Sequence, residues 1–405
     1  MQHWLRPWGA GMGGSSPTPR PRQPTILSLA LGWEKLGVVV YHEPIPWNAD
    51  AVLVQLMLQF PDDLPRRKAD FALVRPEQPP QKPTALVPVR GGHELLFRFP
   101  VPTCSEVAEV VWQDEPLVHA GLTLLTLEQF LDRLQIRQVS VAANLGEVTA
   151  ACSACVGRQV RGLLAAGVIT SPTRLAPLAD LDLAVELRET RGGALQRVAL
   201  KLSGAQLGQK DALLQTAWPK QRRRLGHYSV QWTAGGQVLA HRELRLFSQR
   251  QVSNLITVTA SYYVFKPLSG GTELLRQPPP DGVGWLGPCF LLRSRVPGLA
   301  AELPLAIRAR FRDGRPAEVI GSETFLLTDG PCPVLGELVR TQDLGGIHAF
   351  ELVMEDRLLA LLSTTPAPAA RFTGEGAFEP PDVEYPWSPA ADAELADRLG
   401  KLLDH

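Results

Sequence analysis

Apolar and polar residues alternate along many short stretches of this chain, with a period of two. In the stretch HELLFRF, Leu95, Phe97 and Phe99 alternate with Leu96 and Arg98, as in a β-strand that buries one face. Similar stretches recur about every 8 to 12 residues with turn residues between them, and strands do not alternate with helices. The pattern predicts a mainly β protein whose sheets form antiparallel sandwiches or barrels.

The N-terminal third divides into a tail and a β-rich module. Residues 1–31 are rich in glycine, serine, proline and arginine, which predicts a flexible tail. The tail contains a G-x-G-x-x-G match, but the proline-rich SSPTPRPRQP follows it, where a dinucleotide-binding fingerprint needs a helix. Residues 32–137 predict a β-rich module that ends in a short helix. Thr126 caps this helix, and Gln129 completes a capping box.

The remaining chain predicts two further modules. Residues 138–266 contain the best alternating stretches, including a hairpin around Gly235, and predict a β-sandwich. Residues 267–282 include a glycine pair and three successive prolines, so they predict a linker. Residues 283–365 predict a third β-rich module. Residues 366–405 predict an irregular segment followed by a C-terminal helix, whose single apolar stripe should dock on another surface.

The stretch LGHYSVQW resembles the penultimate strand of an immunoglobulin-like sandwich. In that strand a glycine, one further residue and a tyrosine precede the alternating positions, and here Gly226 and Tyr228 match them. The resemblance implies that the Tyr228 hydroxyl binds nearby backbone as a tyrosine corner. Val230 stands where antibody domains have a cysteine, so the chain resembles the cysteine-less immunoglobulin-like or fibronectin-type domains. The expected fold is therefore three β-rich modules, at least one of them an immunoglobulin-like sandwich, with a few short helices.

Charge and hydropathy narrow the classes of partner. Lys+Arg and Asp+Glu both total 41 among 405 residues, so no net field favours nucleic acid or an acidic membrane. The stretch KQRRRLGHY is a basic cluster, which we interpret as a solvated turn or a contact for an acidic protein. No apolar stretch approaches the ~18 to 20 residues of a membrane span, and no secretory signal is evident. Arginine-rich, asparagine-poor composition indicates a bacterial origin, and we expect a cytoplasmic protein.

Five scattered cysteines favour free thiols over a disulfide framework. Cys152 and Cys155 have C-x-x-C spacing, which allows a redox dithiol, half of a zinc site, or two buried thiols. The surrounding stretch fits a helix or a hairpin turning near Gly146 equally well. Because the chain offers no second ligand pair, we favour buried thiols and expect neither metal nor cofactor.

The sequence contains no nucleophile elbow and no Walker A loop, so it favours a non-catalytic protein-interaction scaffold or adaptor. The alternatives are a hydrolase-like enzyme with a dispersed site, and an exported carbohydrate- or surface-binding protein without a recognisable signal. Export predicts a disulfide between Cys289 and Cys332. The oligomeric state stays open. We expect a protein partner to bind at three places: a tryptophan that follows a proline pair, the basic cluster and the C-terminal stripe. The alternative for the tryptophan is a packing role in the core. The residues are Trp47, Arg222, Arg223, Arg224, Leu395, Leu399 and Leu402.

Overall fold

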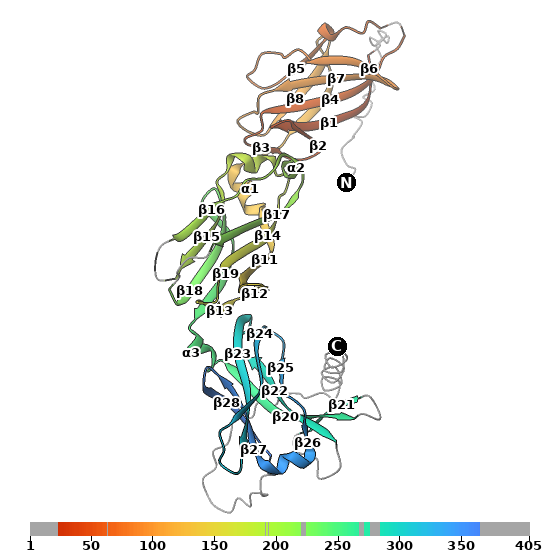
Figure 1. Ribbon diagram of the computed structural model, residues 1–405. Helices are drawn as coiled ribbons and strands as arrows, with labels where there is room; N and C mark the ends of the chain where they lie inside the picture. The colour runs from red at the N-terminus through yellow and green to blue at the C-terminus, as the bar shows by residue number, and fades with distance from the viewer. Residues whose placement is uncertain are drawn as a thin grey trace, which may run out of the picture. The chain divides into compact units, whose positions relative to one another are not determined.

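The computed structural model describes residues 23–364, except 63, 191, 193, 220–223, 267–270 and 276–283. It is mainly β, with several sheets and a few short helices, as the alternating pattern predicts (Figure 1). Two compact units make up the fold. The first unit contains the chain up to Leu134 together with Thr170–Leu181 and Lys201–Ala212. The second contains Gln135–Ile169, Asp182–Leu200 and the chain from Leu213 onwards.

The first unit is built on two antiparallel sheets. Their strand orders are β2-β1-β4-β7-β6 and β5-β8-β9, and β3 pairs with β10 in parallel. The elements of this unit are β1 (Thr25–Lys35), β2 (Val38–Tyr41), β3 (Ile45–Pro46), β4 (Ala51–Gln59), a 3₁₀ turn (Lys68–Asp70), β5 (Phe71–Val74), β6 (Ala85–Val89), β7 (Gly92–Phe99), β8 (Glu106–Trp112), β9 (Glu115–Leu122), β10 (Leu124–Leu125), α1 (Leu127–Arg133), a second 3₁₀ turn (Ala176–Asp180) and α2 (Gly204–Leu207).

One core lies between the two sheets of the first unit. Trp33 of β1 and Phe97 of β7 pack with Phe71 of β5 and Val110 of β8, and all four are at most 1% exposed. The alternation predicted in β7 is therefore confirmed, because Leu95, Phe97 and Phe99 are the buried positions. The predicted capping box at the start of α1 is also present, with Thr126 and Gln129 hydrogen-bonded reciprocally.

Two later chain segments complete the first unit through polar contacts. The Lys35 ammonium lies 2.7 Å from an Asp180 carboxylate oxygen and 3.2 Å from one of Asp50. Burial disfavours the charge of Lys35, but the hydrogen bonds and charges of both aspartates outweigh burial and raise its pKa above the ordinary 10.5. Glu43 accepts a hydrogen bond from Thr173 at 2.6 Å and pairs with Lys210 at 2.8 Å. These contacts fix both segments to the first unit.

The second module, the N-terminal part of the second unit, also has two sheets. One has the order β12-β11-β14-β17, and the other contains β16-β15-β18-β19-β13. Gly167 of β14 lies against Trp232 of β18, since a Cβ at Gly167 would be 3.6 Å from the indole nitrogen. The strands are β11 (Gln135–Asn144), β12 (Thr149–Ala151), β13 (Ala154–Val156), β14 (Gly162–Thr170), β15 (Leu183–Glu189), β16 (Ala194–Ala199), β17 (Asp211–Pro219), β18 (Gly226–Ala234) and β19 (Gln237–Phe247).

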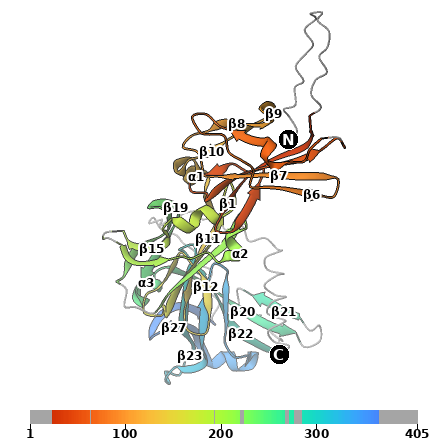
Figure 2. The ribbon, with the colours of Figure 1, turned by 90° about the horizontal axis from the view of Figure 1, so that it is seen from above.

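The third module follows α3 and has its own core between two sheets. One sheet contains β21-β20-β22-β25, and the other contains β23, β24, β27 and β28. Figure 2 shows β21, β20 and β22 side by side. The elements are α3 (Gln249–Val252), β20 (Ile256–Lys266), β21 (Gly271–Leu275), β22 (Trp285–Ser294), β23 (Leu299–Phe311), β24 (Glu318–Leu327), β25 (Cys332–Leu335), β26 (Val339–Arg340), a 3₁₀ turn (Thr341–Gly346), β27 (Ile347–Met354) and β28 (Arg357–Ser363).

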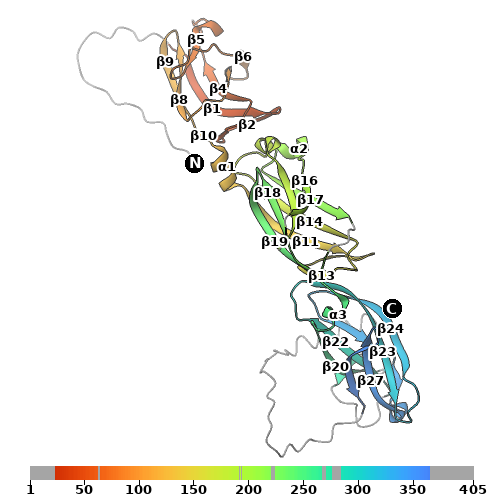
Figure 3. The same ribbon diagram turned by 90° about the vertical axis from the view of Figure 1, so that its left-hand side faces the viewer.

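The three-residue strand β13 continues one sheet from the second module into the third. It pairs in parallel with β19 on one side and with β23 on the other. Figure 3 labels β13 where the chain passes from the second module to the third. Ala154 and Val156 pack into the core of the third module. The Gln159 side chain adds a contact, because it accepts a hydrogen bond from the Glu302 N–H at 2.9 Å and donates one to the Glu302 carbonyl.

The structure corrects two segment predictions. The predicted linker 267–282 does not separate two modules, because the strand before it, β20, pairs along its length with the strand after it, β22. The segment 267–282 itself contains β21, which pairs with β20 in the same sheet. Strand β20 therefore belongs to the third module. The predicted tail 1–31 is also too long, since β1 begins at Thr25. Its first 22 residues lie outside the described part of the chain.

Two local features of the second module confirm the sequence analysis. The hairpin β18–β19 turns at Gly235 and Gly236, both with positive φ, the conformation that favours glycine in a two-residue turn. The Tyr228 hydroxyl donates a hydrogen bond to the Arg224 carbonyl at 2.6 Å. The hydrogen bond of a tyrosine corner, which the resemblance implies, is thus present.

Candidate binding surface

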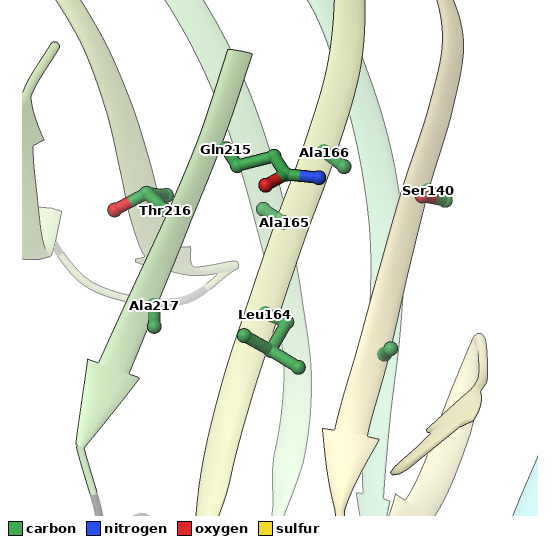
Figure 4. A pocket seen from close by; sticks show the side chains of 8 residues that line it. Ser140, Leu164, Ala165, Ala166, Gln215, Thr216 and Ala217 are labelled. Carbon is green, nitrogen blue, oxygen red and sulfur yellow. The ribbon is translucent and has the colours of Figure 1, made fainter. Parts of the chain in front are cut away.

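A hollow of about 600 Å³ lies on the outer face of the four-stranded sheet of the second module. Strands β11, β14 and β17 form it, and Figure 4 shows how their side chains project. Gln215 reaches from β17 towards Ala166 on β14, while Thr216 points to the other side of the strand. The lining residues are Ser140, Ala142, Leu164, Ala165, Ala166, Gln215, Thr216 and Ala217.

The hollow exists because small residues occupy adjacent outward positions on neighbouring strands. Successive side chains of a strand point to opposite faces, so Leu164 and Ala166 face outwards while Ala165, between them, is 2% exposed. Ala142 of β11 and Ala217 of β17 continue the row of short side chains across the sheet. A larger residue at these positions would fill the space.

None of the described residues that line the hollow is charged. Ser140 and Gln215 supply its polar groups, and alanine and leucine supply most of the rest, since Thr216 points to the other side of β17. A phosphate or carboxylate would meet no cation among these residues, and the Ser140 hydroxyl has no histidine, lysine or carboxylate among them to act as a base. This chemistry fits an uncharged, largely apolar ligand surface.

The structure places Trp47 in the first unit, half-buried rather than free. The Trp47 ring lies 5.1 Å from that of Phe130 on α1, and the backbone N–H of Trp47 donates to the Leu125 carbonyl. Trp47 thus anchors the segment after β3 against α1. The fold assigns it a packing contact, and its predicted part in partner binding stays a prediction.

None of the other predicted partner-binding residues is among the described residues that line the hollow. Arg224 is exposed, and its carbonyl accepts the Tyr228 hydroxyl. Arg222 and Arg223 lie outside the described residues. The same holds for the C-terminal stripe, Leu395, Leu399 and Leu402. Their predicted roles stay predictions.

The cysteines are free thiols in the structure. Cys152 and Cys155 lie at the end of β12 and in β13, so the hairpin interpretation is confirmed and the helix interpretation is wrong. Both are buried. Among the described residues, no three histidine, cysteine or acidic side chains are grouped as metal ligands.

Cys289 and Cys332 do not face each other. Cys289 pairs with Leu335 and Cys332 with Leu292, which places the two cysteines three register positions apart along the β22–β25 ladder. An offset of three positions is about 10 Å, beyond the reach of a disulfide. The disulfide expected for an exported protein is absent between these two residues.

Sequence reasoning missed the hollow itself. Alternation did not identify β14 or β17 as strands, and a hollow on an outer face arises where side chains are short. Its small residues Ala142, Ala166 and Ala217 lie on three strands that pair only after folding, so no local sequence pattern indicates it. In the described ranges no helix has the length and apolar character needed to cross a membrane.

Comparison with known proteins identifies no family. No family model and no curated protein matches the chain. InvD of Yersinia pseudotuberculosis aligns over 82% of this chain and 98% of its own at 11% identity, with a TM-score of 0.22. An ICAM-5 D1–D4 ectodomain fragment aligns over 78% of this chain and 96% of its own at 10% identity, with a TM-score of 0.22. Latent PorU of Porphyromonas gingivalis aligns over 77% of this chain and 31% of its own at 10% identity, with a TM-score of 0.19.

Proposed function

We propose that this protein is a non-catalytic interaction scaffold that holds an uncharged, apolar segment of a protein partner in the hollow on the β11–β14–β17 face. The observation that carries the proposal is the hollow of about 600 Å³ with an uncharged lining on an exposed sheet face. Its volume is within the ~300 to 1,000 Å³ typical of ligand sites.

The architecture supports a binding role. We infer that the second module is an immunoglobulin-like sandwich, since the Tyr228 corner and the tight β18–β19 hairpin are both features of that fold. Such sandwiches host unrelated functions, so the fold alone assigns none. What it supplies is a rigid sheet whose outer residues are set in fixed positions.

The chemistry of the lining selects the class of partner. A nucleic acid or an acidic ligand needs cations at its phosphates or carboxylates, and none of the described lining residues is a cation. Small apolar side chains leave space into which a partner's larger apolar side chain can insert, as in interface pockets. Gln215 and Ser140 at the margin can hydrogen-bond to the partner's backbone.

Replacing Ala166 by arginine tests the proposal, because a long charged side chain on β14 fills the hollow. We expect a protein captured from an extract of the source organism to be retained by the wild type and lost with Ala166→Arg. Titration of the purified partner by calorimetry should then show at least a tenfold weaker affinity, about 1.4 kcal/mol.

Val238→Arg is the matched control. Val238 is 48% exposed on β19, in the opposite sheet of the same module, so its substitution adds the same side chain to an exposed strand position away from the hollow. Equal retention of the partner by the wild type, Ala166→Arg and Val238→Arg would contradict the proposal.

A further inference from the structure

The C-x-x-C thiols are hydrogen-bonded to each other in the folded protein. The chain bends at Ser153 between β12 and β13, which brings the Cys155 thiol to the sulfur of Cys152, where it donates a hydrogen bond. The N–H of Ala143 on β11 donates to the same sulfur. Hydrogen-bonded thiols lie side by side, as the two partners of a disulfide must.

Only one of the two thiols faces a surface. Cys152 is 9% exposed and lines a second hollow, of about 340 Å³, whereas Cys155 is fully buried. This hollow is bordered by Ser153 and by Pro297 and Gly298 before β23. A small reagent that enters this hollow therefore meets Cys152 and not Cys155.

Hydrogen bonding favours the ionised form of the accessible thiol. The bond from Cys155 lowers the pKa of Cys152; burial acts in the opposite direction, and the Ala143 N–H adds to the lowering. Arg242, Glu243 and Asp329 are the charged residues that line the same hollow. In contrast, burial raises the pKa of Cys289 to about 11. The thiolate is the reactive nucleophile, so we expect Cys152 to be more reactive than Cys289.

We propose that Cys152 and Cys155 form a redox-active pair that exchanges with small-molecule disulfides, with Cys152 as the attacking thiol and Cys155 as the resolving thiol. This proposal is independent of the function proposed for the sheet face. It assigns chemistry to a motif that the sequence interpreted as two buried thiols, and three geometric features carry it: the bend between the two cysteines, the hollow at Cys152 and the full burial of Cys155.

The exchange proceeds in two steps. The Cys152 thiolate attacks one sulfur of the small disulfide, whose S–S bond breaks, and a thiolate leaves with the bonding electron pair. Cys155 then loses its proton, and its sulfur attacks the Cys152 sulfur of the mixed disulfide, releasing the second thiolate. Two protein thiols are oxidised, and one small disulfide is reduced to two thiols that take up the protons released.

The location of the pair gives its oxidation a structural consequence. Ser153, between the two cysteines, donates its hydroxyl to the Pro297 carbonyl at 2.7 Å and its N–H to the Gly298 carbonyl at 2.9 Å. A disulfide across this bend would fix the segment that leads into β13, the strand shared by the second and third modules.

Oxidation of the full chain with glutathione disulfide tests the pair. After equilibration in glutathione buffers of stepped ratio, free thiols are alkylated and the peptides are mapped by mass spectrometry. We expect an intramolecular Cys152–Cys155 disulfide, whereas exposed Cys104 should carry glutathione only. With Cys155→Ser, the mixed disulfide at Cys152 should accumulate because its resolving thiol is missing. Absence of both products would overturn the proposal.

Alkylation rates in the wild type give a second readout that requires no variant. At pH 8 a thiol with a pKa of about 11 is thiolate in about one molecule in a thousand. We expect iodoacetamide to label Cys152 at least about tenfold faster than Cys289 in the folded, reduced protein. Equal labelling rates at Cys152 and Cys289 would contradict the assignment of Cys152 as the attacking thiol.

Discussion

Substituting Gly298 by alanine tests the joint at β13. Gly298 has a φ of +67°, and an added Cβ would lie 2.4 Å from the Ser153 hydroxyl oxygen and 2.9 Å from the Ser153 nitrogen. A left-handed conformation costs a residue with a Cβ about 1 kcal/mol or more. Relief of the clash moves Ser153 and removes its hydroxyl hydrogen bond to Pro297, about 1 kcal/mol, and weakens its N–H bond to Gly298. We expect a total loss of about 3 kcal/mol.

Gly314→Ala is the matched control for the conformational part of this loss. Gly314 has a φ of +78°, and no atom lies within 4 Å of the position that an added Cβ would take, so its substitution should cost only about 1 kcal/mol. The excess of about 2 kcal/mol at Gly298 measures the contact with Ser153.

Hydrogen exchange read by mass spectrometry suits this comparison, because unfolding of several modules is not a single two-state transition. Where exchange reports local opening, a loss of about 2 kcal/mol lowers protection about thirtyfold. We expect this decrease in peptides covering β13 and the start of β23 for Gly298→Ala relative to Gly314→Ala. Equal protection of these peptides in the two variants would refute the close approach of Gly298 and Ser153.

Three further substitutions probe other contacts. Tyr228→Phe removes the hydrogen bond to the Arg224 carbonyl and should lower the protection of peptides covering β18 by about 1 kcal/mol in hydrogen exchange; unchanged protection would contradict the corner. Gln159→Ala leaves the N–H and C=O of Glu302 without their side-chain partner and should speed exchange at Glu302, by about 2 kcal/mol of lost protection. Lys35→Met should destabilise the first unit at pH 7. Because the folded pKa of Lys35 is raised above 10.5, its contribution is full below pH 10.5 and lost as the pH rises further, so the difference between wild type and variant should shrink above that pH.

Local alternation predicted many of the strands, but not β14 or β17, and not which strands pair. In β23, Leu303, Leu305 and Ile307 alternate with Pro304 and Ala306 in the sequence, and all three are at most 2% exposed. Strand β20 was assigned to the second module because it precedes a proline-rich segment, yet its partner is β22 on the far side of that segment. Pairing depends on contacts between residues far apart in the sequence, which a local pattern does not contain.

The candidate sites were predicted less well, for a related reason. The tyrosine corner could be anticipated because glycine and tyrosine are adjacent to the strand they fix. The hollow depends on alanines from three strands, and no local signal links them. The C-x-x-C spacing suggested two thiols of interest, but their contact and the unequal exposure of Cys152 and Cys155 follow from the bend at Ser153.

Photo-crosslinking from the hollow tests the central claim most directly. A photoreactive phenylalanine analogue replaces Gln215, at the margin of the hollow on β17, and in a control protein it replaces Val238, on β19 of the opposite sheet. We predict a covalent adduct between the Gln215 site and an uncharged, apolar segment of one protein partner, mapped by mass spectrometry, and no such adduct from the Val238 site. Crosslinks of equal yield from both sites, or none from Gln215 in the presence of a captured partner, would contradict the hollow as the binding surface.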